Sequence, residues 1–543
     1  MSAARQHIRR LLPAVIAAIT VVTFAASLDD GFVDFDDPRI ILENPDYRGL
    51  GWAQLRWMFT AFHMGHYMPL TWLTLGLDYV LWGLNPAGYH LTSVLFHALA
   101  AALLWLVMCR LLAVGFGVPR DDAAVRVGAA VAALVYAVHP QRVESVVWIT
   151  ERRDVLSGVF YLSTILAYLV WVERGAAPGR RYWGVVGLYA CALLSKSMTV
   201  NLPLVLLALD VVPLARLGRS TGWTTARARA VLREKWPFVL LAAAGVVGGF
   251  VGILKIQNLT PLSRFGPLDR LVLSAYGVAF YVGKLVLPID LSPLYERPRI
   301  VEPLSPPYLV AYAVVIGLTA VAWRLRRRAP ALLAAWITYF VILVPVLGFL
   351  QNGPQVTADR YTYYAHLPWI ALLGGVGTWC WRALARVRPQ APVLLVLAAA
   401  ALVLLLQLLT TAQVSVWRDS VSLWRHAWSL NPASPHMNYF LANAMAAQGD
   451  LRAAESHYRA VLERETNLRY DALNNLGIAL ARGGRPREAL EAFVKAAESN
   501  PRRPEACANA RLAAQVLGVP PPDLRCGSGA DGIGLRGPGR PGE

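Results

Sequence analysis

The sequence predicts an all-α protein: a polytopic bundle of transmembrane helices followed by a C-terminal domain of paired amphipathic helices. The 543 residues are 56% hydrophobic and 16% charged, with a mean hydropathy of +0.43, which is too apolar for a soluble domain. Apolar runs close to the roughly 20 residues that span hydrocarbon recur between Leu11 and Thr411. After Thr411 the spacing becomes amphipathic and repeats itself.

Twelve apolar segments are candidate membrane spans. They lie at residues 10–28, 89–113, 124–140, 154–172, 182–197, 199–213, 236–254, 268–289, 305–323, 331–350, 361–381 and 391–411. The amino end also fits a cleavable signal peptide, because Arg5, Arg9 and Arg10 precede an apolar run that ends in small residues. We favour an uncleaved signal anchor.

Twelve crossings would put both ends of the chain on one side, but the basic linkers contradict this. By the positive-inside rule, the linkers that should all be cytoplasmic are 174–181, 216–235, 324–328 and 382–388. About eleven crossings reconcile them, with a cytoplasmic amino terminus and an extracytoplasmic carboxyl end. One segment between 182 and 323 then fails to cross. The crowded pair 182–213 and the segment 268–289, which Lys284 and Pro288 interrupt, remain open alternatives.

Two segments after Thr411 align with each other at an offset of about 35 residues. Their matching positions are Leu441, Ala442, Ala454 and Tyr458 in the first, and Leu476, Gly477, Ala489 and Phe493 in the second, which Ala496 and Pro501 complete. Small residues where paired helices touch and aromatics between them match the tetratricopeptide pattern. Residues 424–427 look like the second helix of a preceding unit, so we expect roughly two and a half repeats. Unrelated amphipathic helices are the alternative.

These patterns divide the chain into three predicted parts. They are a membrane domain at 1–412 with a first exterior loop at 29–88, repeats at 413–519, and a Pro- and Gly-rich disordered tail at 520–543. The net charge of +18 does not indicate a nucleic-acid partner, because Arg and Lys cluster between apolar runs rather than along one helix face. The five cysteines are scattered and suggest neither a disulfide framework nor a metal site.

Polar residues gather in three predicted extracytoplasmic stretches. In the first, the pair Asp36 and Asp37 could supply a general base or hold a divalent cation, although a solvated turn explains it equally well. The aromatic-rich segment 67–82 suits a helix at the membrane interface.

In the second stretch, Arg152 or Arg142 could clamp a phosphate and Glu144 could orient an acceptor, the alternative being interfacial ion pairing. In the third, Lys196 lies between two apolar runs, where an ammonium is costly in hydrocarbon, so it faces a polar cavity or marks the membrane edge. Arg360, beside tyrosines, fits either phosphate binding or interface anchoring.

A longer ordered set of motifs surrounds these residues. It comprises Phe35-Asp36-Asp37 with Asn44-Pro45, Pro69-Leu70-Thr71-Trp72 before Gly83-Leu84-Asn85-Pro86 and Tyr89-His90, Ala137-Val138-His139-Pro140 with Glu144, Trp148, Arg152 and Asp154, then Ser195-Lys196 and Asp359-Arg360-Tyr361. The set resembles the multipass GT-C glycosyltransferases, specifically the transmembrane and tetratricopeptide-repeat protein O-mannosyltransferases and their bacterial relatives. Met68 and Ser197 depart from that family's pattern.

The resemblance implies a GT-C-like bundle that transfers a sugar, mannose by family default, from a polyprenyl-phosphate donor to a protein hydroxyl. The acceptor protein would bind the repeats outside a bacterial cell membrane. The residues that would act on the acceptor hydroxyl are Asp37, Asp36 and Glu144. Those that would neutralise the lipid phosphate are Arg152, Lys196 and Arg360. His139 and Tyr361 would shape the site. A divalent cation, if used, would bind Asp36 and Asp37.

Two hypotheses of other classes compete with this one. A membrane-anchored scaffold would use the repeats to recruit partners and leave the charged loop residues without a role. A secondary transporter would also combine many spans with intramembrane charge, but the hydropathy pattern shows no duplicated halves.

Overall fold

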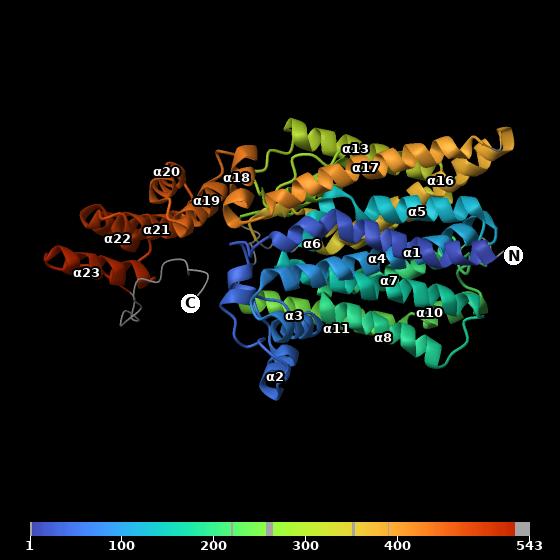
Figure 1. Cartoon of the computed structure of the whole chain (residues 1–543), viewed down its shortest axis with the longest axis horizontal. Helices are drawn as coiled ribbons and strands as arrows, with labels where there is room; N and C mark the ends of the chain where they lie inside the picture. The colour runs from blue at the N-terminus through green and yellow to red at the C-terminus, as the bar shows by residue number, and fades with distance from the viewer. Residues whose placement is uncertain (1–2, 219–220, 257–263, 350–352, 389, 527–543) are drawn as a thin grey trace. The chain divides into compact units, whose positions relative to one another are not determined.

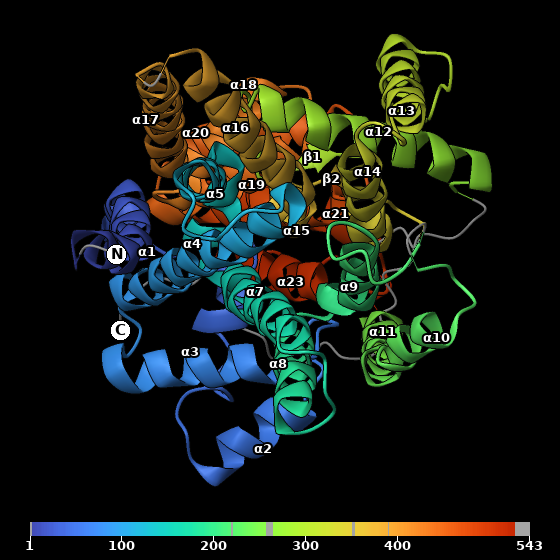
Figure 2. The same cartoon turned by 90° about the vertical axis from the view of Figure 1, so that its right-hand side faces the viewer.

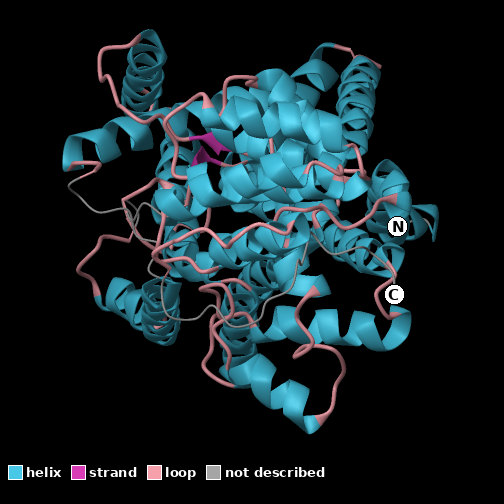
Figure 3. Cartoon of the chain, turned by 90° about the vertical axis from the view of Figure 1, so that its left-hand side faces the viewer, coloured by secondary structure: helices cyan, strands magenta, loops and turns pink. Residues whose placement is uncertain are grey.

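The computed structural model describes residues 3–218, 221–256, 264–349, 353–388 and 390–526. Within them the regular secondary structure is almost entirely helical, with one antiparallel pair of short strands, β1 (Tyr295–Glu296) and β2 (Gln355–Thr357). The predicted all-α class is confirmed (Figure 3). The chain forms two compact units. The first joins Met1–Gly31 to Asp37–Ser415, and the second joins Phe32–Asp36 to Val416–Glu543.

Helices of the first unit alternate between long apolar rods and short connecting turns. In chain order they are α1 (Ala3–Phe24), α2 (Trp52–Thr60), α3 (Pro69–Trp82), α4 (Pro86–Phe116), α5 (Ala123–Ala137), α6 (Val143–Val147), α7 (Arg152–Glu173), α8 (Arg180–Ser195), α9 (Leu202–Val211), α10 (Ala226–Arg233), α11 (Trp236–Ile256), α12 (Pro267–Val286), α13 (Pro306–Arg324), α14 (Pro330–Leu343), α15 (Thr362–Ala365), α16 (Leu367–Val387) and α17 (Pro392–Val416). Figure 1 shows α1, α4, α5 and α7 running side by side.

Six helical segments among the described residues are long and apolar enough to cross a membrane. They are Leu11–Asp29, Pro86–Phe116, Ile149–Glu173, Ala226–Lys255, Pro306–Arg324 and Pro392–Val416. Ala123–Ala137 with Pro140–Val147, bent by 57°, would make a seventh. Shorter apolar helices cover Ser197–Val211 and Pro330–Val346. These segments support an integral membrane protein, whereas the expected total of about eleven crossings remains a prediction.

Close contact between α5 and α16 depends on a small residue. A Cβ added at Gly128 would come within 2.3 Å of Thr378 Oγ1 and within 2.6 Å of the Gly374 carbonyl oxygen. Small residues let transmembrane helices approach because apolar lipid provides little drive for helix association. The contact fixes the position of α5 against α16. The residues of the candidate site begin directly after α5 in the sequence.

The segment predicted to lie at the membrane interface forms α3. Figure 2 looks along many of the bundle helices and shows α3 lengthwise, so α3 lies across them. Its exposed apolar side chains include Val80 and Leu81 at 56% and 61% exposure, whereas Trp72 and Leu75 are fully buried. The helix α3 is thus apolar on both its buried and its exposed sides, and its place at the membrane interface remains a prediction.

The described residues of the second unit form a stack of six helices. They are α18 (Ser420–Leu430), α19 (Pro435–Gln448), α20 (Leu451–Leu462), α21 (Arg469–Arg482), α22 (Pro486–Ser499) and α23 (Glu505–Leu517). Its core contains the predicted positions Ala442, Ala454, Tyr458, Leu476, Ala489 and Phe493. A Cβ at Gly477 would come within 2.5 Å of the Phe493 ring, which explains the small residue there. Of the predicted tail, residues 527–543 lie outside the described residues.

A disulfide joins Cys507 in α23 to Cys526, with 6.4 Å between the two Cα atoms. The sequence had suggested no disulfide framework, and that interpretation was wrong at this pair. The two cysteines are 19 positions apart, and only the return of the chain after α23 brings them together. Residues 520–526 are thereby tied to the repeat unit.

Candidate functional site

A group of buried charges forms where α5 gives way to α7. Three short helices make this connection: η3 (Pro140–Arg142), α6 and η4 (Ile149–Glu151). His139 caps the first, because its Nδ1 accepts a hydrogen bond from the Gln141 N–H at 3.3 Å, and Pro140 suits the first helical position. The chain then enters α7 with every charged residue from Glu151 to Asp154 buried.

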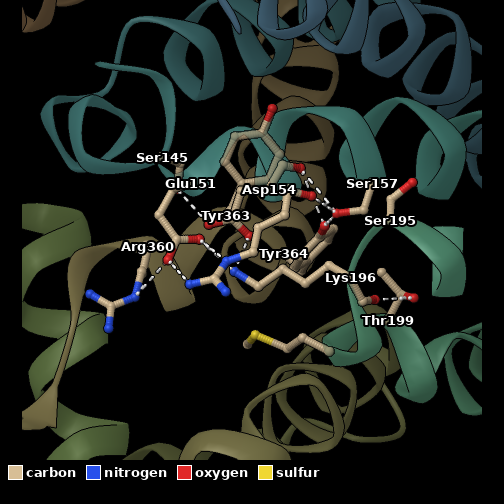
Figure 4. Close-up of polar contacts among 12 residues, drawn as sticks. Ser145, Glu151, Asp154, Ser157, Ser195, Lys196, Thr199, Arg360, Tyr363 and Tyr364 are labelled. Atoms are coloured by element: carbon tan, nitrogen blue, oxygen red, sulfur yellow. Dashed lines mark hydrogen bonds and ion pairs between the residues drawn. The ribbon is translucent and has the colours of Figure 1, made fainter. Parts of the chain in front are cut away.

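Glu151 lies at the centre of this group (Figure 4). Arg153 binds its carboxylate with two hydrogen bonds, from Nη2 at 2.6 Å and from Nε at 3.0 Å. Lys196 Nζ approaches Oε2 at 2.9 Å, and Arg360 Nε approaches Oε1 at 3.3 Å. One fully buried carboxylate therefore holds three cations from three separate segments of the chain.

Lys196 stands at the end of α8, where the chain turns into a short helix at Ser197–Asn201. Besides Glu151, its ammonium binds Asp154 Oδ1 at 2.6 Å. Asp154 Oδ2 in turn accepts a hydrogen bond from Ser145 Oγ at 3.1 Å. Two carboxylates thus compensate the charge of Lys196, whereas the two predicted alternatives, a polar cavity or the membrane edge, both remain predictions.

Arg360 reaches the group from the segment before α15. Its guanidinium pairs with Glu144 Oε1, and its backbone N–H donates to Glu144 Oε2 at 2.7 Å. The guanidinium also lies 5.0 Å from the Tyr361 ring centre and 5.5 Å from that of Trp148. Glu144 and the two rings thus fix the direction of Arg360.

The group is balanced in charge but not in exposure. Three cations (Arg153, Lys196 and Arg360) face three carboxylates (Glu144, Glu151 and Asp154). Arg153 keeps 9% of its side chain accessible and the other two cations 11% each, whereas Glu151 and Asp154 keep 0%. The accessible side of the group is therefore positive, with the carboxylates behind it, and it suits an incoming anion.

Asp37 adjoins the same connection. It is buried, and its Oδ1 accepts hydrogen bonds from the Thr150 backbone N–H at 3.1 Å and the Thr150 hydroxyl at 2.6 Å. Thr150 directly precedes Glu151. Asp36 instead belongs to Phe32–Asp36, which packs with the repeat unit, so the acidic pair is divided between the two compact units.

Arg152 is not brought into the group. Its guanidinium is fully buried, pairs with Asp78 at 2.7 Å, and donates from Nε to Ser93 Oγ at 2.8 Å. Arg152 thereby ties α7 to α3 and α4. The next residue, Arg153, faces Glu151 instead, since successive helical residues point about 100° apart. Sequence reasoning missed Arg153 and Glu151, and the run Glu151-Arg152-Arg153-Asp154 was the signal that could have found them.

Of the two residues predicted to shape the site, Tyr361 lies beside the charged group and His139 packs elsewhere. The Tyr361 ring lies beside the Arg360 guanidinium, as described above. His139 is buried, its Nε2 is 3.1 Å from the Leu285 carbonyl oxygen, and its ring contacts His366. Arg142, the other candidate for a phosphate, is also buried and donates to Thr362 Oγ1 at 2.7 Å. His139 and Arg142 therefore support the fold at this end of the bundle.

His66, between α2 and α3, lies near the group, since it interacts electrostatically with Arg153, Glu151, Lys196 and Arg360, and it was given no role from the sequence. The protein atoms around its ring lower the pKa of His66 well below the usual value by desolvation. The positive charge of Arg153 lowers the pKa further, Glu151 opposes this, and Lys196 and Arg360 add to the lowering. His66 is therefore a neutral imidazole at neutral pH.

Among the described residues, no three or more His, Cys, Asp or Glu side chains are arranged to hold a metal ion. The expected divalent cation at Asp36 and Asp37 remains a prediction.

Comparison with known proteins confirms the predicted family resemblance. The chain is 26% identical over 518 residues to protein O-mannosyl-transferase TMTC1 of Homo sapiens, covering 86% of this chain and 56% of that protein. It is 35% identical over 135 residues to Tmtc3 of Drosophila melanogaster, covering 23% of this chain and 14% of that protein. The chain thus spans somewhat more than half the length of the TMTC1 relatives that it matches along most of its own sequence.

No protein-family model matches the chain. Among solved structures, that of the APC/C hetero-tetramer Cut9-Hcn1 covers 89% of this chain and 92% of its own at 13% identity. Its TM-score of 0.19 is too low to support an argument.

Proposed function

We propose that this chain, a homologue of the TMTC protein O-mannosyl-transferases, is a membrane glycosyltransferase. It moves a sugar, mannose by analogy, from a polyprenyl-phosphate donor to a hydroxyl of an acceptor protein. The observation that carries the proposal is the accessible positive side of the buried group around Glu151. A lipid phosphate that leaves with two negative charges needs such fixed cations.

Lys196 and Arg360 would bind the donor phosphate, together with Arg153. Their carboxylate partners hold them in place before the donor arrives, so little reorganisation accompanies the reaction. Glu144 would position Arg360, since it binds both the guanidinium and the backbone N–H of that residue. Arg152, whose guanidinium is occupied by Asp78, would support the helices instead.

Asp37 would act as the general base. In this step the acceptor oxygen forms a bond to the anomeric carbon of the sugar, and the bond from that carbon to the phosphate oxygen breaks. The phosphate keeps the electron pair, and the hydroxyl proton passes to the Asp37 carboxylate. Attack from the face opposite the phosphate inverts the anomeric carbon. The Thr150 bonds to Oδ1 fix the carboxylate in one orientation.

The repeats would lie on the extracytoplasmic side of a bacterial cell membrane and bind the acceptor protein. The disulfide between Cys507 and Cys526 supports this side, because disulfides persist in oxidising compartments. The amino terminus would then be cytoplasmic if the number of crossings is odd.

Sugar transfer in isolated membranes tests the proposal. Asp37→Asn removes the base while keeping the size of the side chain, and should lower transfer from polyprenyl-phosphate mannose to protein by about 10²–10⁴-fold. Asp29→Asn, at an exposed aspartate of the same exterior stretch, is the matched control and should transfer normally. Normal transfer by Asp37→Asn would exclude Asp37 as the base. A wild-type chain that transfers nothing would favour the scaffold hypothesis.

A further inference from the structure

We propose that Tyr295 is a positioning residue of the donor-phosphate site, and that the loop at 287–305 between α12 and α13 thereby forms part of this site. Tyr295 would not touch the donor itself. It would act through Asp359, the residue directly before Arg360 in the sequence. The inference rests on the proposed function, because Arg360 is proposed to bind the donor phosphate together with Arg153 and Lys196.

Arg360 lies in a segment that is too short to hold its own position. The 3₁₀ turn η7 (Asp359–Tyr361) comprises three residues, and the helix α15 that follows comprises four. Isolated helices shorter than about 12 residues are marginal in water. The position of the Arg360 backbone therefore depends on side chains that bind this segment from other parts of the chain.

The Asp359 carboxylate is the point at which such side chains bind. It is buried, and two neutral groups donate to it: Gln141 Nε2 to Oδ1 at 3.0 Å, and the Tyr295 hydroxyl to Oδ2 at 3.0 Å. A buried carboxylate oxygen that loses its donor keeps the full cost of its desolvation. The two hydrogen bonds therefore fix the chain directly before Arg360.

The Tyr295 hydroxyl is itself held in one direction. It accepts a hydrogen bond from the Ser292 backbone N–H at 3.0 Å. Its ring packs edge-on against Phe280 of α12, with 4.7 Å between the ring centres. Its backbone lies opposite Thr357 in the antiparallel pair of β1 and β2. Tyr295 thus connects α12 and β2 to Asp359.

Arg360 makes two contacts that require the turn at Asp359 to stay in place. Its backbone N–H donates to Glu144 Oε2 at 2.7 Å, and its guanidinium pairs with the same carboxylate. Gln141 belongs to the connection after α5 that also carries Glu144, so Tyr295 is the anchor that comes from a different part of the bundle. Without the Tyr295 hydroxyl, the turn would shift and the guanidinium would lose its direction.

Binding of polyprenyl phosphate, the donor without its sugar, to the full chain in lipid nanodiscs tests the inference. Tyr295→Phe removes one hydroxyl and should raise the Kd about tenfold. Tyr312→Phe is the matched control, because the Tyr312 hydroxyl donates to the Pro303 carbonyl oxygen at 3.1 Å and should leave the Kd unchanged. Equal Kd values for the wild type and Tyr295→Phe would overturn the inference.

A double substitution shows whether Tyr295 acts through Arg360. In the background of Arg360→Met, Tyr295→Phe should change the Kd of polyprenyl phosphate by less than about twofold, because the group that it positions is gone. A further tenfold loss in that background would show that Tyr295 acts through another group, and would overturn the inference.

Hydrogen exchange of the Arg360 amide separates this inference from the proposed function, because it needs no donor. The amide is bonded to Glu144 in the wild type. Its exchange should be at least about tenfold faster in Tyr295→Phe and unchanged in Tyr312→Phe. Faster exchange in a chain that binds no polyprenyl phosphate would support the positioning of Arg360 by Tyr295 and refute the transferase. Unchanged exchange in Tyr295→Phe would overturn the inference, whatever the chain binds.

Discussion

Glu151 receives Lys196 at 2.9 Å on one carboxylate oxygen, while the other oxygen faces Arg360 at 3.3 Å. Lys196 ends α8 and Arg360 precedes α15, so one carboxylate links three parts of the bundle. A buried anion with several cationic partners is costly to form but more costly to disrupt, because each partner would be left uncompensated.

Glu151→Gln should therefore destabilise the protein strongly, by about 3–5 kcal/mol. Thermal unfolding in detergent measures the effect. Glu173→Gln is the control, because Glu173 pairs with Arg120 at an exposed position and should change stability by about 0–1 kcal/mol. Equal unfolding temperatures for the two variants would contradict the central role of Glu151.

Lys196→Met should remove a cation that is proposed to bind the donor phosphate and reduce transfer by about 10²–10³-fold. Lys196→Arg keeps the charge and should retain more activity. Single-turnover transfer from polyprenyl-phosphate mannose measures both variants. Lys495→Met, at an exposed lysine of the repeat unit, serves as the control. Wild-type transfer by Lys196→Met would remove this lysine from the proposed site.

Arg152 and Arg153 should differ in the kind of defect that their loss causes. Arg152→Ala leaves Asp78 buried without its ion pair and should lower stability by about 3–5 kcal/mol. Arg153→Lys keeps the charge but loses the two-point contact with Glu151, so we expect a donor KM raised about 10-fold with little change in unfolding temperature. The opposite assignment of the two defects would show that Arg152 is the residue that meets the donor.

Stability should depend on pH through His66. Its pKa is lowered in the folded protein, so below the ordinary histidine value of about 6.5 the unfolded chain binds the proton more readily. The contribution of His66 to the free energy of unfolding is then fully present above about pH 6.5 and is lost as the pH falls below that value. His66→Gln should remove most of the decrease in the free energy of unfolding below about pH 6.5. Above about pH 7.5, the free energy of unfolding should depend on pH in the same way in the variant and in the wild type. Unfolding measured at a series of pH values checks both outcomes.

The disulfide allows a test of the side of the membrane on which the repeats lie. In intact cells, a membrane-impermeant maleimide should label Cys507 and Cys526 only after reduction, because the repeats are proposed to face outward. Cys109, buried within α4, should stay unlabelled and serves as the control. Labelling after reduction only in permeabilised cells would place the repeats in the cytoplasm.

The sequence by itself determined the all-α class, the apolar spans and the repeat positions. These features depend on composition and on periods of a few residues, so Leu476, Gly477 and Phe493 could be aligned with their counterparts before any packing was known. The order of the motifs also indicated that Glu144, Lys196 and Arg360 contribute to one site.

Only the tertiary structure decided which charges meet. Arg152 and Arg153 are neighbours in sequence, but the helix directs one towards Asp78 and the other towards Glu151. Asp36 and Asp37 read as one acidic pair, yet the chain passes between two compact units at that bond. Ion pairs form over a few ångströms between side chains whose directions follow from helix packing, and helix packing is not local in the sequence.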